Sequence, residues 1–204
     1  GVHTGDCQLL DTRIGISNTL GKYGQSASYS RNASDGYKYN TDYEIEHYTY
    51  QGSLGPNGNQ LNLLASHSSR KFGANGFYAS PDFMDQYEET HTSFVALDYS
   101  KLIGGWYINP KVSYRRNKDD YVFLRENPSF FNNVHTSEVL NGELQARSSN
   151  PLGIFQIGAE YNMMNLESNN LGVRERNTAS INAEQRILLM NEKLDITPGV
   201  SYSY

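Results

Sequence analysis

The sequence predicts an all-β fold, an up-and-down antiparallel β-barrel of about ten long strands. Three observations predict it: side chains alternate between apolar and polar along many segments, turn residues separate these segments, and the connections alternate between short and long. The alternation is clearest in Gly104–Arg116, where Trp106 and Tyr114 share one parity while Lys111 and Arg115 share the other. Because successive side chains of a strand point to opposite faces, this segment has one apolar and one charged face.

The two aromatic residues that bound this apolar face indicate its surroundings. Trp106 and Tyr114 are eight residues apart, which is roughly 26 Å along a strand, or about 20 Å of height at a tilt near 40°. This height is close to the apolar band of a barrel that crosses a membrane. The mean hydropathy of −0.65 is compatible with such a barrel, since only every second residue of a strand needs to be apolar. No stretch approaches the roughly 18 consecutive apolar residues of a transmembrane helix.

Period-2 segments bounded by turn residues recur along the whole chain. The strands predicted from them are 8–18, 22–32, 42–54, 59–70, 87–100, 104–117, 135–148, 153–166, 173–189 and 193–204. Charged side chains on the polar parity are expected to face the lumen: Asp98, Lys111, Arg115, Glu160, Glu184 and Arg186. Side chains on the other parity are expected to face lipid: Trp106, Ile108, Val112, Tyr114, Ile157 and Val200.

The connections place short turns at one end of the predicted sheet and long loops at the other. Short connections fall at 19–21, 55–58, 101–103, 149–152 and 190–192, and longer ones at 33–41, 71–86, 118–134 and 167–172. Outer-membrane barrels have this arrangement, with both chain ends on the short-turn side. Here the first predicted strand begins on the long-loop side, and the last predicted strand finishes on that side. We therefore expect residues 1–204 to form a single barrel fragment, without a plug domain and without the remaining strands.

Composition and motifs argue against several classes of function. The net charge of −5 and the absence of a Lys/Arg stripe predict no nucleic-acid partner. Cys7 is the single cysteine, so there is no disulfide framework. No catalytic motif is present, so we predict no enzyme, no cofactor and no metal site. Acidic groups such as Asp82 with Asp85 offer ligands for a hard cation, but solvated loop acids are the simpler interpretation.

The long loops hold the candidate ligand-binding residues. These are aromatic and amide side chains beside glycines, and aromatic rings bury a large area at low entropic cost. The candidates are Tyr37, Tyr39, Phe72, Asn75, Phe77, Tyr78, Phe130, Phe131 and Asn132. The alternative is that these rings pack the loops against one another.

Four stretches carry a resemblance to a known family: Arg70–Tyr78, Glu88–Thr92, Arg115–Tyr121 and Asn132–Thr136. With them the chain resembles, over essentially its whole length, the barrel of TonB-dependent outer-membrane receptors, particularly the vitamin B12 transporter branch. The resemblance implies a location in the outer membrane of a Gram-negative bacterium and a parent barrel of 22 strands closed by a plug domain. It also implies lipid, the plug domain, the TonB system and a small-molecule nutrient as partners.

The function that the resemblance implies is energy-coupled uptake of a scarce nutrient, such as a siderophore or cobalamin, by the parent protein. A second hypothesis is a stand-alone β-barrel that binds a ligand or mediates adhesion without transport, with the apolar parity as its core. Predicted strands of twelve or more residues argue against it, since strands of soluble sandwiches usually have about five or six residues. A third hypothesis, an outer-membrane lipase or protease, lacks an identifiable nucleophile and base.

Overall fold

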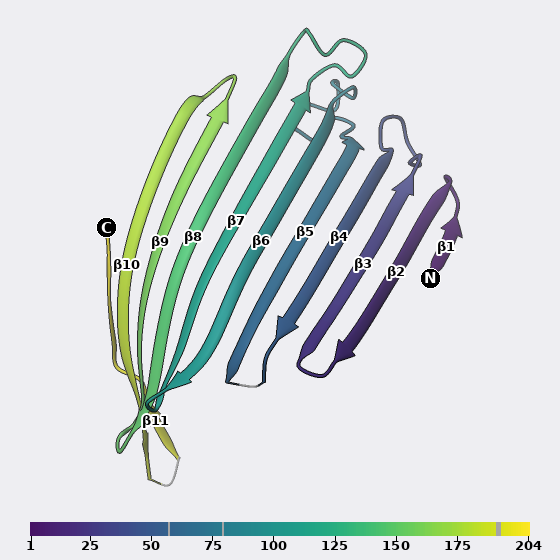
Figure 1. Cartoon of the computed structure of the whole chain (residues 1–204). Helices are drawn as coiled ribbons and strands as arrows, with labels where there is room; N and C mark the ends of the chain where they lie inside the picture. Colours follow the sequence, from purple (N-terminus) through teal and green to yellow (C-terminus); the bar gives the residue numbers. More distant parts are fainter. Residues whose placement is uncertain (57, 79, 191–192) are drawn as a thin grey trace.

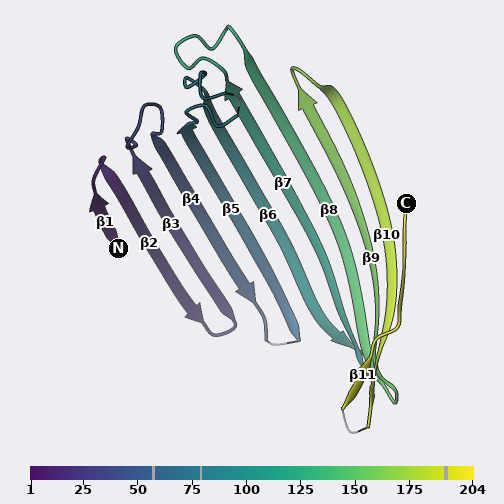
Figure 2. The same cartoon turned by 180° about the vertical axis from the view of Figure 1, so that it is seen from behind.

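The computed structural model describes residues 1–56, 58–78, 80–190 and 193–204. All strands of these residues belong to one antiparallel sheet, drawn as a single curved layer in Figure 1 and from behind in Figure 2. The two chain ends lie at opposite lateral edges of the layer. No helix within these ranges is long and apolar enough to cross a membrane.

The strands follow the chain order, each pairing with the next from β1 to β11, while β12 pairs with β10 beside β11. Their bounds are β1 Val2–Gly5, β2 Leu9–Leu20, β3 Tyr23–Ser34, β4 Tyr43–Leu54, β5 Asn59–Gly73, β6 Tyr87–Ile103, β7 Trp106–Val122, β8 Asn132–Asn150, β9 Gly153–Ser168, β10 Gly172–Leu189, β11 Leu194–Ile196 and β12 Gly199–Ser203. The prediction of an all-β, up-and-down antiparallel sheet is confirmed.

Each of the ten predicted strands has a counterpart, with differences at the ends. Strands β5, β7 and β8 extend further toward the long loops than predicted, by up to five residues in β7, which ends at Val122 rather than 117, whereas β6 extends toward its short turn, to Ile103. The polar run Lys118–Asp120 has no period-2 signal, yet its backbone still pairs with β6 and β8. The four-residue strand β1 was missed because it is too short to show alternation.

The last predicted strand is interrupted. Residues 193–204 form β11 and β12, which pair with the same edge of β10 in one continuous register. Pro198 lies between them and has no N–H to donate to a ladder. Its carbonyl still accepts a hydrogen bond of 3.0 Å from Gln185 N, so the backbone keeps its course along β10.

Short turns and long loops lie at opposite ends of the sheet, as predicted (Figure 1). The turn between β6 and β7 consists of Gly104 and Gly105 with φ of 55° and 84°, values that glycine adopts without strain. The predicted turns 55–58 and 190–192 include Asn57, Asn191 and Glu192, which lie outside the described residues. The loops at the other end are 35–42, 74–86 and 123–131, with a tighter connection at 169–171.

A proline interrupts the pairing of β6 with β7. The register joins Asp98 to Lys111 and resumes at Lys101 and Ile108. The gap lies opposite Pro110, which lacks a backbone donor. The side chain of Asn109 compensates, since its Nδ2 donates to Tyr99 O at 3.0 Å.

The register separates two faces of the sheet. The polar face carries Asp98, Lys111, Arg115, Glu160, Glu184 and Arg186. The apolar face carries Trp106, Ile108, Val112, Tyr114, Ile157 and Val200. Within the described residues β1 does not pair with β11 or β12, so the sheet is open. Its buried apolar residues there are Ala74 and Val122, both beside the long loops.

Candidate ligand-binding loops and membrane face

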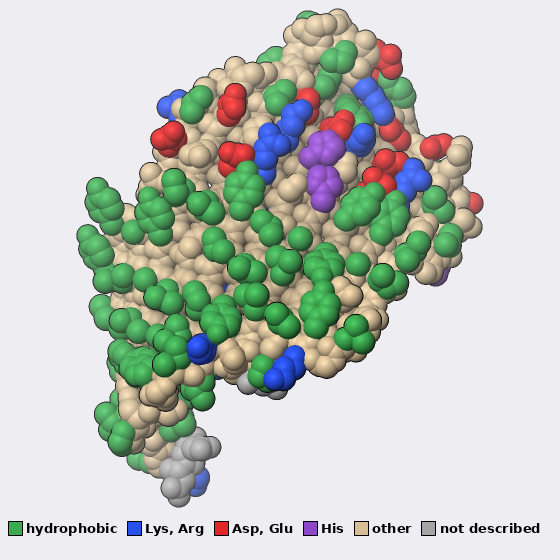
Figure 3. All heavy atoms as spheres, viewed as in Figure 1, with side chains coloured by type: hydrophobic (Ala, Val, Ile, Leu, Met, Phe, Trp, Pro, Cys, Tyr) green, Lys and Arg blue, Asp and Glu red, His purple; other side chains and the backbone are tan. Residues whose placement is uncertain are grey.

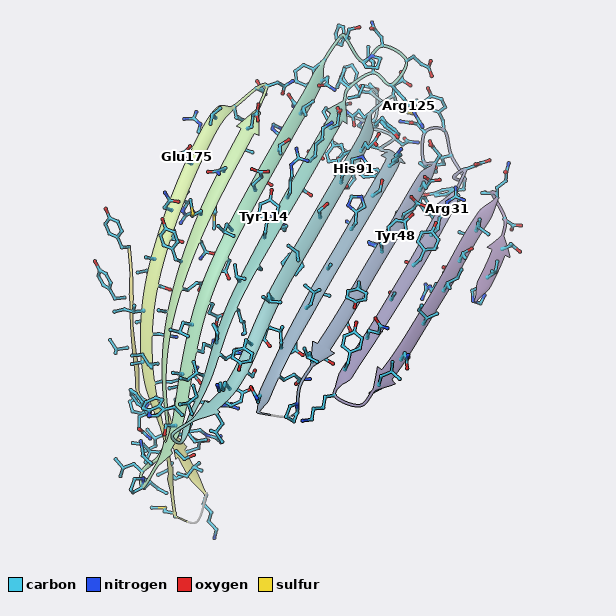
Figure 4. All side chains as sticks on the ribbon, viewed as in Figure 1. Arg31, Tyr48, His91, Tyr114, Arg125 and Glu175 are labelled. Atoms are coloured by element: carbon cyan, nitrogen blue, oxygen red, sulfur yellow. The ribbon has the colours of Figure 1, made fainter. Side chains whose placement is uncertain are left out.

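Three long loops pack together around Arg125 at one end of the sheet. Arg125 lies in loop 123–131 and reaches to loop 35–42, where Nη1 and Nη2 donate to the Asp42 carboxylate at 2.6 and 2.9 Å. Nη1 also donates to Asn40 Oδ1 at 3.1 Å, and the guanidinium lies 4.4 Å from the ring centre of Tyr87. Its backbone N donates to Asp85 O at 2.9 Å. Arg125, labelled in Figure 4, therefore joins all three loops.

Amide side chains make further connections between the loops. Asn40 Nδ2 donates to Met84 O at 2.7 Å and to Gln86 O at 2.6 Å. Gln86 is fully buried, and its Oε1 accepts the backbone N–H of Tyr78 at 3.2 Å. The two bonds from Asn40 and the bond from Tyr78 N to Gln86 Oε1 fix the loop at these points over the end of β6, while Gln86 Nε2 is buried without a partner among the described residues.

The Arg125–Asp42 pair stays ionised over a wide pH range. Hydrogen bonding to Arg125 lowers the pKa of Asp42 below its usual value, and the same contact raises the pKa of Arg125. The side chains are 38% and 36% exposed, so solvent screens part of their attraction. The two parallel N–H···O bonds fix the relative position of the loops more than they add stability.

The predicted loop residues fall into an exposed group and a fixed group. Tyr37, Phe77 and Phe130 are exposed to 77%, 79% and 64%, although Phe77 also contacts the ring of Tyr78 and Phe130 that of Phe123. Tyr39 and Asn75 are fixed: the Tyr39 hydroxyl donates to Asp85, which raises the pKa of Tyr39, and Asn75 Nδ2 donates to Tyr39 O. The exposed rings keep most of their surface available for a ligand.

Two other candidates pack against neighbouring rings. Tyr78 lies edge-on to Phe77 and Tyr121, with ring centres 5.0 and 5.4 Å apart. Phe131 lies edge-on to Phe123 at 6.4 Å. Both arrangements agree with the alternative that aromatic rings hold the loops together.

Two candidates are not in loops. Phe72 belongs to β5 and Asn132 to β8, where Asn132 Nδ2 donates to Asp120 Oδ1 at 2.6 Å. Their assignment to loops was wrong because polar residues at the strand ends hide the alternation, whereas the backbone pairing continues through them.

Sequence analysis missed the residues that organise the loops. Asp42 and Arg125 are 83 residues apart, and neither stands in a local motif. Phe123 lies at the centre of an aromatic cluster, with ring centres 5.2 Å from Phe83 and 6.2 Å from Phe130. The only signal in the sequence is the concentration of Phe residues in the two longest loops.

A polar groove of about 440 Å³ runs below Arg125 on the apolar face. Its charged lining residues are Arg31, Asp35, Asp42, Glu44, Lys71 and Arg125. Opposite charges pair within it, as in the contact of Arg31 with Glu44. The groove is therefore polar without a large net charge.

The polar face is connected by cross-strand hydrogen bonds. The register places Asp98, Lys111, Glu143 and Glu160 in one row across β6 to β9. Asn62 Nδ2 donates to Asp98 Oδ1 at 2.8 Å, and Lys111 Nζ lies 3.6 Å from Glu143 Oε2. Mixed charges of this kind are typical of a wall that faces water or another polar surface.

The apolar face has two zones, which Figure 3 shows as green side chains across the middle and lower part and charged side chains above them. Aromatic residues stand at both limits of the green zone. Near the short turns, Trp106 lies edge-on to Phe155 at 6.1 Å. Toward the long loops, Tyr114 Oη donates to Glu138 at 2.6 Å and Tyr29 Oη to Glu46 at 2.7 Å. Rings with a polar tip at such a limit are typical of membrane interfaces.

The loop acids do not assemble a cation site. Asp85 accepts the Tyr39 hydroxyl and Asp82 accepts Ser80 Oγ at 3.2 Å. Among the residues with described positions, no group of three His, Cys, Asp or Glu side chains is placed to hold a metal ion.

Comparison with known proteins links this architecture to solved receptors. No protein-family model and no curated protein sequence matches the chain. The siderophore receptor PirA from Pseudomonas aeruginosa matches 96% of the chain with a TM-score of 0.76 and 12% identity. The siderophore receptor PiuA from Acinetobacter baumannii matches 100% of it with a TM-score of 0.67 and 12% identity. The chain spans 33% of PirA and 45% of PiuA. It therefore shares its fold with part of these two siderophore receptors.

Proposed function

We propose that the chain forms part of the wall of a TonB-dependent outer-membrane receptor in a Gram-negative bacterium. The parent protein takes up a scarce small-molecule nutrient, such as a siderophore or cobalamin, with energy supplied through the TonB system. The observation that carries the proposal is the separation of an apolar band, limited by aromatic rings, from an opposite face that carries the charged rows of Asp98, Lys111 and Glu160, in a sheet of this fold. The polar face would then line the lumen and contact a plug domain.

A stand-alone soluble barrel is less well supported by the apolar face. In such a barrel this face would form the core, with its side chains withdrawn from solvent. Ile16, Ile181 and Val200 are instead exposed to 72%, 60% and 71% in the open sheet. A single layer with this much exposed apolar surface needs lipid or another surface against it.

Cysteine labelling tests the membrane placement. In the full-length parent with Cys7→Ser, single cysteines at Trp106, Val112, Ile157 and Val200 are expected to react with a membrane-embedded maleimide and to resist an aqueous one. Cysteines at the polar-face control positions Lys111 and Glu160 are expected to show the opposite preference, because their side chains leave the sheet on the other side. Equal aqueous labelling of both sets contradicts the proposal.

Substitution of the exposed loop aromatics tests the role of the loops in uptake. The triple variant Tyr37→Ala, Phe77→Ala, Phe130→Ala is expected to raise the KM for uptake of the transported ferric siderophore or cobalamin at least about tenfold, since each anchoring ring contributes about 1 kcal/mol or more. Leu171→Ala, at an exposed site between β9 and β10, is the control and is expected to leave KM unchanged. An unchanged KM in the triple variant refutes the assignment of ligand contacts to these loops.

A further inference from the structure

A compact group of basic side chains lies on the apolar face, directly beyond its apolar zone toward the long loops. We name this group the cationic patch; it consists of His67, His91, Arg116 and Lys118. The register pairs His91 with Lys118 and places His67 and Arg116 on either side of Ser93. The two imidazole rings are stacked with centres 6.2 Å apart. In Figure 4, His91 lies above the labelled Tyr48 and Tyr114.

Two members of the patch, Arg116 and Lys118, keep N–H donors for a ligand. His67 uses Nδ1 in its contact with Ser93 Oγ at 2.9 Å, and His91 uses Nε2 in its contact with Glu89 at 2.7 Å. Arg116 contacts Glu138 through Nε at 3.3 Å, which leaves its two terminal nitrogens. Across the parts of the chain with described positions, Lys118 forms no ion pair.

The carboxylates around the patch already have partners, some of them within the patch. Glu89 lies 3.4 Å from Lys71 Nζ as well as beside His91. Glu138 accepts the Tyr114 hydroxyl in addition to the Arg116 contact. Asp120 accepts the amide of Asn132. The positive charge of Lys118 is therefore the one left without a close counter-charge in this group.

The apolar zone begins immediately below the patch on the same three strands. Two residues from His67 and Ser93 toward the short turns, the register places Ala65 and Val95 in one row with Tyr114. The next row is Leu63, Leu97 and Val112. Successive rows on one face are separated by about 7 Å along the strand. An anion at the patch thus has an apolar strip starting within one row of it.

From this juxtaposition we propose that the cationic patch binds the phosphate of a membrane lipid whose acyl chains lie along the strip from Ala65 and Val95 to Leu97 and Val112. Cationic side chains next to an apolar surface match the phosphate and the acyl chains of one lipid molecule. The inference rests on the membrane placement proposed above. It adds to that placement a defined lipid site at the rim nearest the long loops.

Lipid retention measured by native mass spectrometry tests the proposal. The full-length parent in detergent is titrated with dioleoyl phosphatidic acid or with dioleoyl glycerol, which has the same chains and no phosphate. Phosphatidic acid is expected to bind stoichiometrically and dioleoyl glycerol is not. Lys118→Gln is expected to weaken phosphatidic acid binding about fivefold, as for one cation near a lipid surface. Lys118→Gln with Arg116→Gln is expected to weaken it about 25-fold.

Two controls separate the proposal from its alternatives. Lys101→Gln removes a cation from the same face near the short turns, and it is expected to leave binding unchanged; a loss equal to that of Lys118→Gln means unspecific attraction and overturns the proposal. Full competition by millimolar inorganic phosphate also overturns it, because the site then takes free phosphate. If the cysteines of the two faces label as expected under the proposed function but the patch variants do not change lipid binding, the lipid site is rejected and the membrane placement is kept. Aqueous labelling of both faces rejects the membrane placement as well.

Discussion

Val112→Arg is expected to lower the free energy of unfolding of the full-length parent in lipid vesicles by about 1–3 kcal/mol, between the cost of a cation at the middle of the bilayer and its cost near the interface. Val112 is 46% exposed on the apolar face, six residues from Trp106 and two residues from Tyr114. The guanidinium of an arginine at this site has to extend about 7 Å along the strand, past Tyr114, to reach water. The measurement is urea-induced unfolding in vesicles, followed by tryptophan fluorescence.

The neighbouring residue supplies the matched control. Ser113 lies on the polar face, in register with Ala96 and Asn141. Ser113→Arg is expected to change the free energy of unfolding by less than about 0.5 kcal/mol, as for a typical surface substitution. A similar loss of unfolding free energy in the two variants would show that alternate residues of β7 do not face different surroundings. The assignment of the apolar face to lipid would then fail.

Arg125→Ala is expected to release the long loops from one another. The variant loses the bidentate contact with Asp42, the bond to Asn40 and the stacking on Tyr87. Charge-assisted bonds contribute about 1.5–3 kcal/mol when buried, and partial exposure reduces the expected loss to about 1–2 kcal/mol of local stability. Hydrogen exchange of the amides in 35–42 and 74–86 is expected to accelerate about five- to thirtyfold, while exchange in the middle of β4 to β7 stays unchanged.

A second ion pair serves as control for the loss of an arginine. Arg13 contacts Asp11 at 2.9 Å, and its side chain is 73% exposed. Arg13→Ala is expected to leave exchange in the loops unchanged, because a surface pair of this kind contributes little. If Arg125→Ala also leaves the loops unchanged, Arg125 is not the residue that holds them together.

The course of the strands within the apolar zone could be predicted from the sequence because only one face of the sheet is apolar there. Val112 and Ile157 alternate with Lys111 and Gly158, so period 2 is visible in the sequence itself. Beyond Tyr114 both faces of β7 become polar, and Lys118–Asp120 looks like a loop. Backbone pairing continues there because it depends on hydrogen bonds that every residue type except proline can make.

The arrangement of the loops could not be predicted for a different reason. Asp42 and Arg125 belong to loops that are not consecutive, and their contact depends on how far each loop reaches over the end of the sheet. Aromatic content identified Tyr37, Phe77 and Phe130 as candidate ligand contacts, but only the three-dimensional structure separates these exposed rings from Tyr39, which is fixed to Asp85.

The side-chain amide of Asn109 donates to Tyr99 O, the carbonyl opposite Pro110, and this hydrogen bond limits which substitutions the two positions tolerate. A backbone carbonyl that is left without a hydrogen bond away from water costs free energy comparable to a lost hydrogen bond, so Pro110 is tolerated because Asn109 precedes it. Replacing Asn109 while Pro110 remains leaves the Tyr99 carbonyl without this donor. Replacing Pro110 first provides a backbone N–H at position 110, so the side-chain amide is no longer needed. Substitutions at positions 109 and 110 therefore depend on each other, and we expect the proline to be replaced before the asparagine.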